Sequence, residues 1–127
     1  MATQPGEVVL AEGPKGRVIG LVLPTGACPA RQFLVGLGTR EQARFAALLE
    51  RLTQIGYLRA TAEMRRLEVS GDPAIHEIKV HTGPGFRLYV VQGHREWVAT
   101  HGIKKPKDKA VPGEVARARA MYKEWAS

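Results

Sequence analysis

The sequence is poor in the residues that most often reveal a protein's chemistry. Cysteine occurs once in 127 residues, at Cys28, so no disulfide can form within the chain and a reducing compartment is indicated. Aromatic residues make up 6% of the chain, and no apolar run reaches the roughly 18 residues that a membrane-spanning helix needs. The first residues lack the basic-then-apolar pattern of a signal peptide. We therefore expect a cytoplasmic protein that does not use a membrane.

Signatures of metal binding and of other common chemistries are missing as well. The histidines and the cysteine show no C-x-x-C or H-x-x-x-H spacing, and His76 and His81 point to opposite faces of one predicted strand. The segment Gly13-Pro14-Lys15-Gly16 lacks the Gly-Lys-Ser/Thr ending of a phosphate-binding loop and predicts a turn. Paired carboxylates of the glycosidase kind are not evident. We expect neither a metal nor another cofactor.

Acidic residues are scarce relative to basic ones. The chain has 19 Lys and Arg against 12 Asp and Glu, a formal net charge of +7. Residues 1–75 hold nine basic and seven acidic side chains, whereas residues 76–127 hold ten and five, so the excess lies in the second part. This pattern favours an acidic partner such as a nucleic acid, although solubility alone would also explain it.

The most informative stretch of the chain alternates apolar and polar residues from Ala74 to Pro106. Three runs with a period of two, separated by turn residues, predict a three-stranded antiparallel meander. Its apolar face consists of Ile78, Val80, Phe86, Leu88, Val90, Trp97 and Ala99. Its other face carries Glu77, Lys79, His81, Arg87, Tyr89 and Thr100, and leads to His101, Lys104, Lys105 and Lys107.

The turns of the meander predict which residues pair. A loop over Thr82 to Phe86 places Lys79 opposite Tyr89, and a two-residue turn at Gly93-His94 places Tyr89 opposite Val98. The apolar face must be covered by other elements. We expect the polar face to stay open, as a site for a polyanion.

The rest of the chain predicts further elements. Runs from Glu7 to Leu10 and from Arg17 to Leu23 flank the glycine-rich turn and predict a hairpin, after a frayed tail from Met1 to Gly6. A short helix is expected from Ala30 to Leu37. A longer helix begins at Thr39, where Gln42 suggests a capping box, and ends at Ile55.

These two helices are expected to form a hairpin that covers the apolar face of the sheet. The longer helix presents Arg40, Arg44 and Arg51 mostly away from its apolar stripe, as a solvated face or, alternatively, as contacts to a ligand. The segment from Met64 to Val69 fits either a strand or the end of a helix. A last helix is predicted from Pro112 to about Trp125.

The polar face suits cleavage of RNA without a metal. Such cleavage needs a base for the 2′-hydroxyl, cations for the charge that develops on phosphorus, and an acid for the leaving 5′-oxygen. Arg87 is the candidate charge stabiliser, Lys79 and His101 are candidate acid or base groups, and Tyr89 is a candidate for stacking on a base. Ordinary solvated strand residues would give the same pattern, so the residues alone leave both interpretations open.

Several segments, taken in order, resemble the HigB-like, phage-derived branch of the RelE/ParE toxin superfamily. They are Glu77-Ile78-Lys79, Gly85-Phe86-Arg87, His101-Gly102-Ile103-Lys104-Lys105 and the run from Pro112 to Ala118. The segment from Phe33 to Leu58 is also similar to the helical hairpin of that family. The resemblance spans about residues 17 to 125. It departs from the family pattern at Lys79, where Arg is frequent, and at Ile103, where Phe is usual.

The resemblance implies an α+β fold of the RelE kind, with an N-terminal αα-hairpin packed on a small twisted antiparallel sheet, and a C-terminal helix. Residues 1–127 would form a single domain, with residues 1–16 as an N-terminal extension able to form a strand. The catalytic candidates are Lys79, Arg87, His101 and Lys104. The candidates for RNA binding are His81, Tyr89, Lys105 and Lys107.

The function implied is that of a type II toxin, a metal-free endoribonuclease that cleaves mRNA on the translating ribosome. Its partners would be mRNA, the ribosome and a cognate antitoxin with a helix-turn-helix domain. Two alternatives stay open: a ParE-like gyrase inhibitor that is not a nuclease, and a phage protein that only binds nucleic acid or a partner. A defective prophage remnant without activity is a third.

Overall fold

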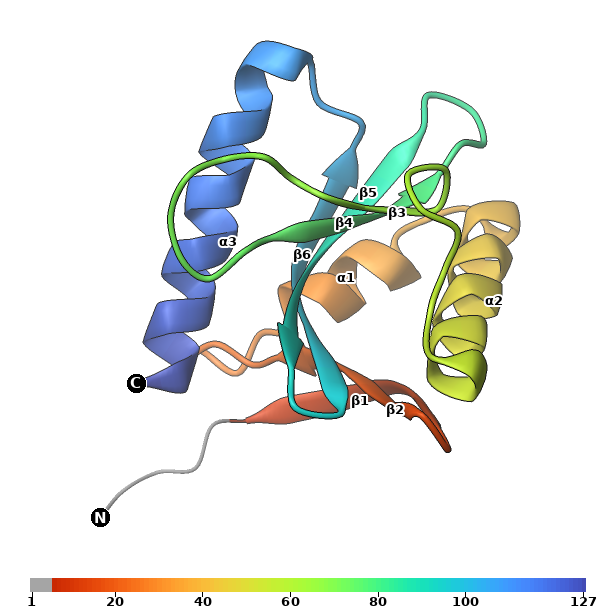
Figure 1. Cartoon of the computed structure of the whole chain (residues 1–127), viewed down its shortest axis with the longest axis horizontal. Helices are drawn as coiled ribbons and strands as arrows, with labels where there is room; N and C mark the ends of the chain where they lie inside the picture. The colour runs from red at the N-terminus through yellow and green to blue at the C-terminus, as the bar shows by residue number, and fades with distance from the viewer. Residues whose placement is uncertain (1–5) are drawn as a thin grey trace.

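The computed structural model describes residues 6–127 and shows a mixed sheet between two layers of helices (Figure 1). The strand order is β1-β2-β6-β5-β4-β3. The elements are β1 (Glu7–Gly13), β2 (Gly16–Leu21), α1 (Pro29–Val35), α2 (Thr39–Ile55), β3 (Met64–Arg66), β4 (His76–Val80), β5 (Phe86–Gly93), β6 (Glu96–Lys104), the 3-10 helix η1 (Asp108–Ala110) and α3 (Val111–Ala126). The frayed tail predicted for Met1 to Gly6 lies outside the described residues, apart from Gly6 itself.

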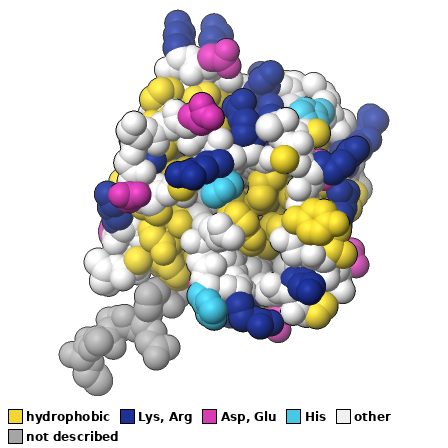
Figure 2. Space-filling view, in the orientation of Figure 1, with side chains coloured by type: hydrophobic (Ala, Val, Ile, Leu, Met, Phe, Trp, Pro, Cys, Tyr) yellow, Lys and Arg dark blue, Asp and Glu magenta, His cyan; other side chains and the backbone are white. Residues whose placement is uncertain are grey.

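The surface is rich in basic side chains. On the face seen in Figure 2, Lys and Arg occur in several places, among them the edge where α2 lies, with apolar side chains between them. Within residues 6–127, no helix is long and apolar enough to cross a membrane.

The N-terminal hairpin is confirmed, but its role in the sheet was not foreseen. β1 and β2 pair antiparallel around Pro14 and Lys15, and β2 then runs parallel to β6, with Val18 opposite Trp97. The side chains of Val18, Ile19 and Leu21 are fully buried. A continuous apolar run of this kind is typical of a strand with both faces covered.

The predicted architecture, an N-terminal αα-hairpin on a small antiparallel sheet, is therefore wrong. Two strands precede the first helix, and the sheet has six strands, one pair of them parallel. The physical reason is that β2 cannot leave its apolar residues in solvent, and the free side of β6 offers it unpaired backbone groups. The residues from 6 to 16 that were expected to form an extension mostly belong to β1.

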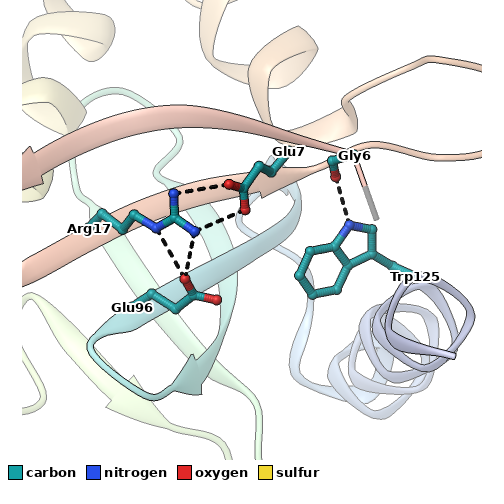
Figure 3. Close-up of polar contacts among 5 residues, drawn as sticks. All are labelled: Gly6, Glu7, Arg17, Glu96 and Trp125. Carbon is teal, nitrogen blue, oxygen red and sulfur yellow. Dashed lines mark hydrogen bonds and ion pairs between the residues drawn. The ribbon is translucent and has the colours of Figure 1, made fainter. Parts of the chain in front are cut away.

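One arginine connects the three strands at this end of the sheet (Figure 3). Arg17 on β2 contacts Glu7 on β1 through its two Nη atoms, at 2.9 and 3.1 Å, and its Nε donates to Glu96 Oε1 on β6 at 3.1 Å. Trp125 on α3 donates its Nε1–H to the carbonyl oxygen of Gly6 at 2.7 Å. Because the arginine and its partners are partly exposed, these ion pairs define the strand positions more than they add stability.

The first core lies between the sheet and the pair α1 and α2. The helical stripe of α2 is buried as predicted except at its last residue, Ile55, which is exposed. The buried part packs against the apolar face of the meander, which includes Ile78, Leu88 and Val90. Phe33 of α1 lies edge-on to Phe45, with ring centroids 5.7 Å apart. The helical cover predicted for this face is confirmed.

The second core lies on the opposite face, which we expected to be open. Here Val91 and Val98 pack with Val115 and Ala118 of α3. The helix forms where it was predicted, but its apolar stripe needs a partner, and the two sheet valines supply one. The polar face of the meander is therefore covered along much of its length.

The predicted residue pairs are wrong in both hairpins of the meander. Lys79 pairs with Arg87, while Tyr89 pairs with Glu77. The β5–β6 turn is formed by His94 and Arg95, of which Arg95 has φ of 56°. A bulge in β6 follows, where Thr100 and His101 lie opposite the single residue Tyr89. Val91, rather than Tyr89, therefore lies opposite Val98.

The start of α2 also differs from the prediction. Its N-cap residue is Gly38, and no side chain caps the helix. The amide of Gln42 instead reaches back and donates to the carbonyl oxygens of Val35 at 3.2 Å and Leu37 at 2.6 Å. Gln42 therefore holds the end of α1 against the start of α2, rather than completing a capping box.

Candidate functional site

The strongest concentration of charge lies around Glu77 on β4. Its carboxylate is 3.0 Å from Arg65 Nη2, 3.6 Å from Arg87 Nε and 4.0 Å from Lys79 Nζ. We call these four residues the Glu77 cluster. Adjacent strands bring them together, because Arg65 of β3 pairs with Glu77 and Lys79 of β4 pairs with Arg87 of β5. Three cations share one carboxylate, so the cluster keeps a net charge of about +2 when its lysine is protonated.

Burial makes this charge unusual. The side chains of Glu77, Lys79 and Arg87 are 3%, 13% and 7% exposed, whereas that of Arg65 is 48% exposed. Burial and then Arg65 lower the pKa of Lys79, while Glu77 raises it in part. Lys79 therefore has a larger neutral fraction near neutral pH than a free lysine. A neutral amine of this kind can accept a proton.

Gly85 brings the lysine-rich end of β6 and the residues after it, from Lys104 to Lys107, close to the cluster. Its φ of +84° favours glycine, and a Cβ there would lie 3.7 Å from Arg87 Nη1 and 3.5 Å from Lys105 Cβ. The backbone N–H of Lys105 donates to the carbonyl oxygen of Gly85 at 2.9 Å. Lys105 is itself exposed. A cation from β6's extension therefore lies beside those of β4 and β5.

His101 and Tyr89 are buried away from solvent. His101 is 2% exposed, with Nε2 3.2 Å from Glu114 Oε1 and Nδ1 3.2 Å from Thr100 Oγ1. Burial lowers its pKa, and Glu114 opposes this in part. The Tyr89 ring is fully buried and stacks on the His101 ring, with centroids 4.9 Å apart. Burial, then Glu77, raises the pKa of Tyr89.

These contacts give the two residues a different place from the one predicted. Tyr89 has no exposed ring face for a nucleotide base, and His101 is engaged where α3 docks on the sheet. The sequence pattern could not show this, because the burial depends on α3 crossing the polar face.

The remaining predicted residues are exposed. His81 follows β4, with Nε2 2.7 Å from the carbonyl oxygen of Ala62. Lys104 ends β6 opposite Phe86, and Lys107 precedes η1. The structure thus brings together Lys79 and Arg87 and places Lys105 beside them. It leaves His81, Lys104 and Lys107 on the surface.

Sequence reasoning missed two members of the cluster, Arg65 and Glu77. Glu77 was placed on the polar face but given no role, and Arg65 lies in a segment that fitted two kinds of element. The available signal was the pair Arg65-Arg66 next to a turn, which becomes meaningful only once β3 is known to pair with β4.

Two grooves adjoin the cluster. One, of about 700 Å³, lies between β3 and the start of α3 and is lined by Arg65, Arg66 and Asp108 among others. The second, of about 600 Å³, lies between α2 and the end of β4, and Lys79 is among its lining residues. Both are open to solvent, so an extended ligand can approach the cluster from either side.

Other kinds of site find little support in the described part of the chain. No three His, Cys, Asp or Glu side chains among residues 6–127 gather closely enough to hold a metal ion. Cys28 is buried. Compared with known protein families and with curated proteins, the chain matches none.

Proposed function

We propose that this protein is a metal-free endoribonuclease that cleaves mRNA on the ribosome, as the toxin partner of an antitoxin. The observation that carries the proposal is the Glu77 cluster, whose three cations outnumber its carboxylate and converge from three strands. Lys79 and Arg87 also belong to the segments that resemble the RelE/ParE toxins. A surplus of positive charge is what the transition state of phosphodiester cleavage requires, and Arg65 and Arg87 supply it against the one carboxylate even when Lys79 is neutral.

The chemistry assigns one task to each group. Neutral Lys79 takes the proton of the 2′-hydroxyl, whose oxygen attacks the adjacent phosphorus and forms a 2′,3′-cyclic phosphate. Arg87 and Arg65 stabilise the charge on the non-bridging oxygens with their planar forks. The bond from phosphorus to the 5′-oxygen breaks, and that oxygen takes a proton from the ammonium group of Lys105. Because His101 is buried against Glu114, it has no part in these proton transfers.

Arg65 is the member of the cluster that a phosphate from solvent reaches first. It is the most exposed member of the cluster and lines the groove beside β3. A phosphate that binds there competes with Glu77 for the same cations. The carboxylate therefore holds the cations in place until the substrate arrives.

Pulse labelling in bacterial cells tests the proposal. After induction, protein synthesis should stop while DNA synthesis continues, and Arg87→Gln or Lys79→Met should abolish the arrest. Lys123→Met, at an exposed position of α3, is the matched control and should behave as the unaltered chain does. Circular dichroism of each purified variant shows whether it is folded. A folded Arg87→Gln variant that still arrests translation would overturn the proposal.

The burial of His101 favours a second candidate, a protein that binds but does not cleave. Without that imidazole, the cations of the cluster are suited to holding an anionic group of a nucleic acid or a protein. A ParE-like gyrase inhibitor and a phage binding protein both belong to this class. Labelling separates the two candidates, because a gyrase inhibitor stops DNA synthesis first.

A further inference from the structure

The groove between α2 and the end of β4 is strongly basic. Four arginines, at positions 40, 44, 51 and 59, line it together with Lys79 and His81. We call it the α2 groove. Lys and Arg side chains are visible along the edge of the molecule where α2 lies (Figure 2). A groove of about 600 Å³ with this lining is a site for an anion rather than for an apolar ligand.

A single acidic residue lines the groove, and its carboxylate is already engaged. Glu63 Oε1 accepts hydrogen bonds from Arg51 Nη1 at 2.6 Å and from the backbone N–H of Arg59 at 2.9 Å. These bonds, with that of Arg59 first, lower the pKa of Glu63. Arg40 and Arg44 are exposed, and neither forms an ion pair with a described residue. Glu63 thus fixes one end of the groove and leaves the other end positive.

The helix sets the spacing of the arginines. Arg40, Arg44 and Arg51 lie on one face of α2 because four and eleven residues correspond to about one and three helical turns. They extend along about 16 Å of helix axis at 1.5 Å per residue. A row of this length suits an extended chain of phosphates better than one small anion.

The lining also indicates what the groove does not recognise. It contains no Phe, Tyr or Trp on which a base could stack, its one ring is that of His81, whose Nε2 is engaged with the carbonyl oxygen of Ala62, and its apolar members are small or buried. Protein partners are usually anchored by large apolar or aromatic contacts, which this groove does not offer. Guanidinium forks that face solvent are instead typical of contacts with phosphate oxygens.

We infer that the α2 groove holds the sugar–phosphate backbone of single-stranded RNA, independently of sequence, and guides it to the Glu77 cluster. Lys79 is among the residues that line the groove, and its Nζ belongs to the cluster. Because α2 packs on the apolar face of the sheet and the Lys79 side chain lies on the other face, the RNA passes from the groove to the cluster around the edge of the sheet at β4. The choice of RNA rests on the proposed function. The binding itself needs only the arginines, so it can be measured without cleavage.

Fluorescence anisotropy tests the inference with a labelled RNA of about a dozen nucleotides, 2′-O-methylated so that it cannot be cleaved. The double variant Arg40→Gln, Arg44→Gln should bind at least about tenfold more weakly. Between about 50 and 200 mM salt, its plot of log K against log salt should be shallower by about 1.4, since each lost contact to a single strand contributes about 0.7. Oligonucleotides of different sequence should give similar affinities.

Arg31→Gln, Lys123→Gln is the matched control, because it removes two exposed cations outside the groove. Equal affinity of the two double variants would overturn the inference. If an acidic peptide such as oligoglutamate binds through Arg40 and Arg44 and RNA does not, the inference is overturned in favour of a protein partner. Arginine-dependent binding, with messages left intact in a bacterial translation extract that contains ribosomes, would support the inference and refute the nuclease proposal. If both double variants bind RNA equally well and messages are still cleaved, the nuclease proposal is supported and the groove inference is refuted.

Discussion

Replacing the buried carboxylate of the Glu77 cluster should destabilise the protein and create an anion site. Glu77→Gln keeps the shape of the side chain but removes its charge. Lys79 and Arg87 are then buried without a counter-ion, while Arg65 can turn toward solvent because it is about half exposed. The variant therefore separates the neutralising role of Glu77 from its packing.

The size of the effect follows from the burial of the partners. Removing one member of a buried ion pair costs about 3–5 kcal/mol. The lower end applies here, because Arg65 is partly solvated and Lys79 Nζ is 4.0 Å from the carboxylate. With a urea m-value of about 1.5 kcal/mol/M, a loss of about 3 kcal/mol lowers the unfolding midpoint by about 2 M.

Urea unfolding with and without inorganic phosphate is the assay. Phosphate should restore stability to Glu77→Gln more than to the unaltered chain, because it can replace the missing carboxylate. At ten times its dissociation constant, phosphate would contribute about 1.4 kcal/mol. Glu50→Gln is the control, since Glu50 is exposed and forms no ion pair with a described residue. An unchanged midpoint in Glu77→Gln, with no selective effect of phosphate, would refute the reasoning.

Two further predictions concern packing and pH. A Cβ on Gly102 would overlap the Phe33 ring, so Gly102→Ala should lower the unfolding free energy by about 1–3 kcal/mol. Gly113 lies in open space on α3, so Gly113→Ala should raise it by about 0.5–1 kcal/mol. Thermal unfolding of both variants checks this, and equal stabilities would contradict it. Burial lowers the pKa of both His76 and His101. The unfolded chain therefore binds these protons first, and stability should fall as pH drops below about 6.5, by up to about 1.4 kcal/mol per pH unit for each histidine. Urea midpoints between about pH 5 and 8 should show this slope, a His76→Gln variant should reduce it, and a slope that His76→Gln leaves unchanged would contradict the prediction.

Local patterns predicted the elements well, because each depends on neighbours in sequence. The stripe of α2 and the alternation of the meander place their residues on the correct faces. The predicted partner of Lys79 was wrong by two residues, Tyr89 instead of Arg87. A shift of two preserves the face of every side chain, since strand side chains alternate with a period of two. The faces could therefore be predicted although the pairs could not.

The arrangement of the elements depended on contacts that sequence patterns do not encode. The run from Arg17 to Leu23 fits a strand at the edge or in the middle of a sheet, and nothing local selects β6 as its parallel neighbour. Likewise, the stripe of α3 predicts burial but not which sheet face it covers. That choice buries His101 and Tyr89 and confines the predicted site to Lys79, Arg87 and their neighbours.

The conformation of Arg95 explains why the turn between β5 and β6 was misplaced. A two-residue hairpin turn favours glycine where φ is positive, so the sequence pointed to Gly93. In the structure Arg95 adopts φ of 56° instead, and Gly93 pairs with Glu96 in the ladder. The parallel contact of Arg17 with Glu96 holds this end of β6 in place, which offsets the cost of the strained residue.

Primer extension on cellular mRNA after induction tests the proposed nuclease most directly. The proposal predicts new 5′ ends inside reading frames, on translated messages only, which disappear with Arg87→Gln and persist with Lys123→Met. Intact messages in cells whose growth has stopped, or identical ends with Arg87→Gln, would contradict it.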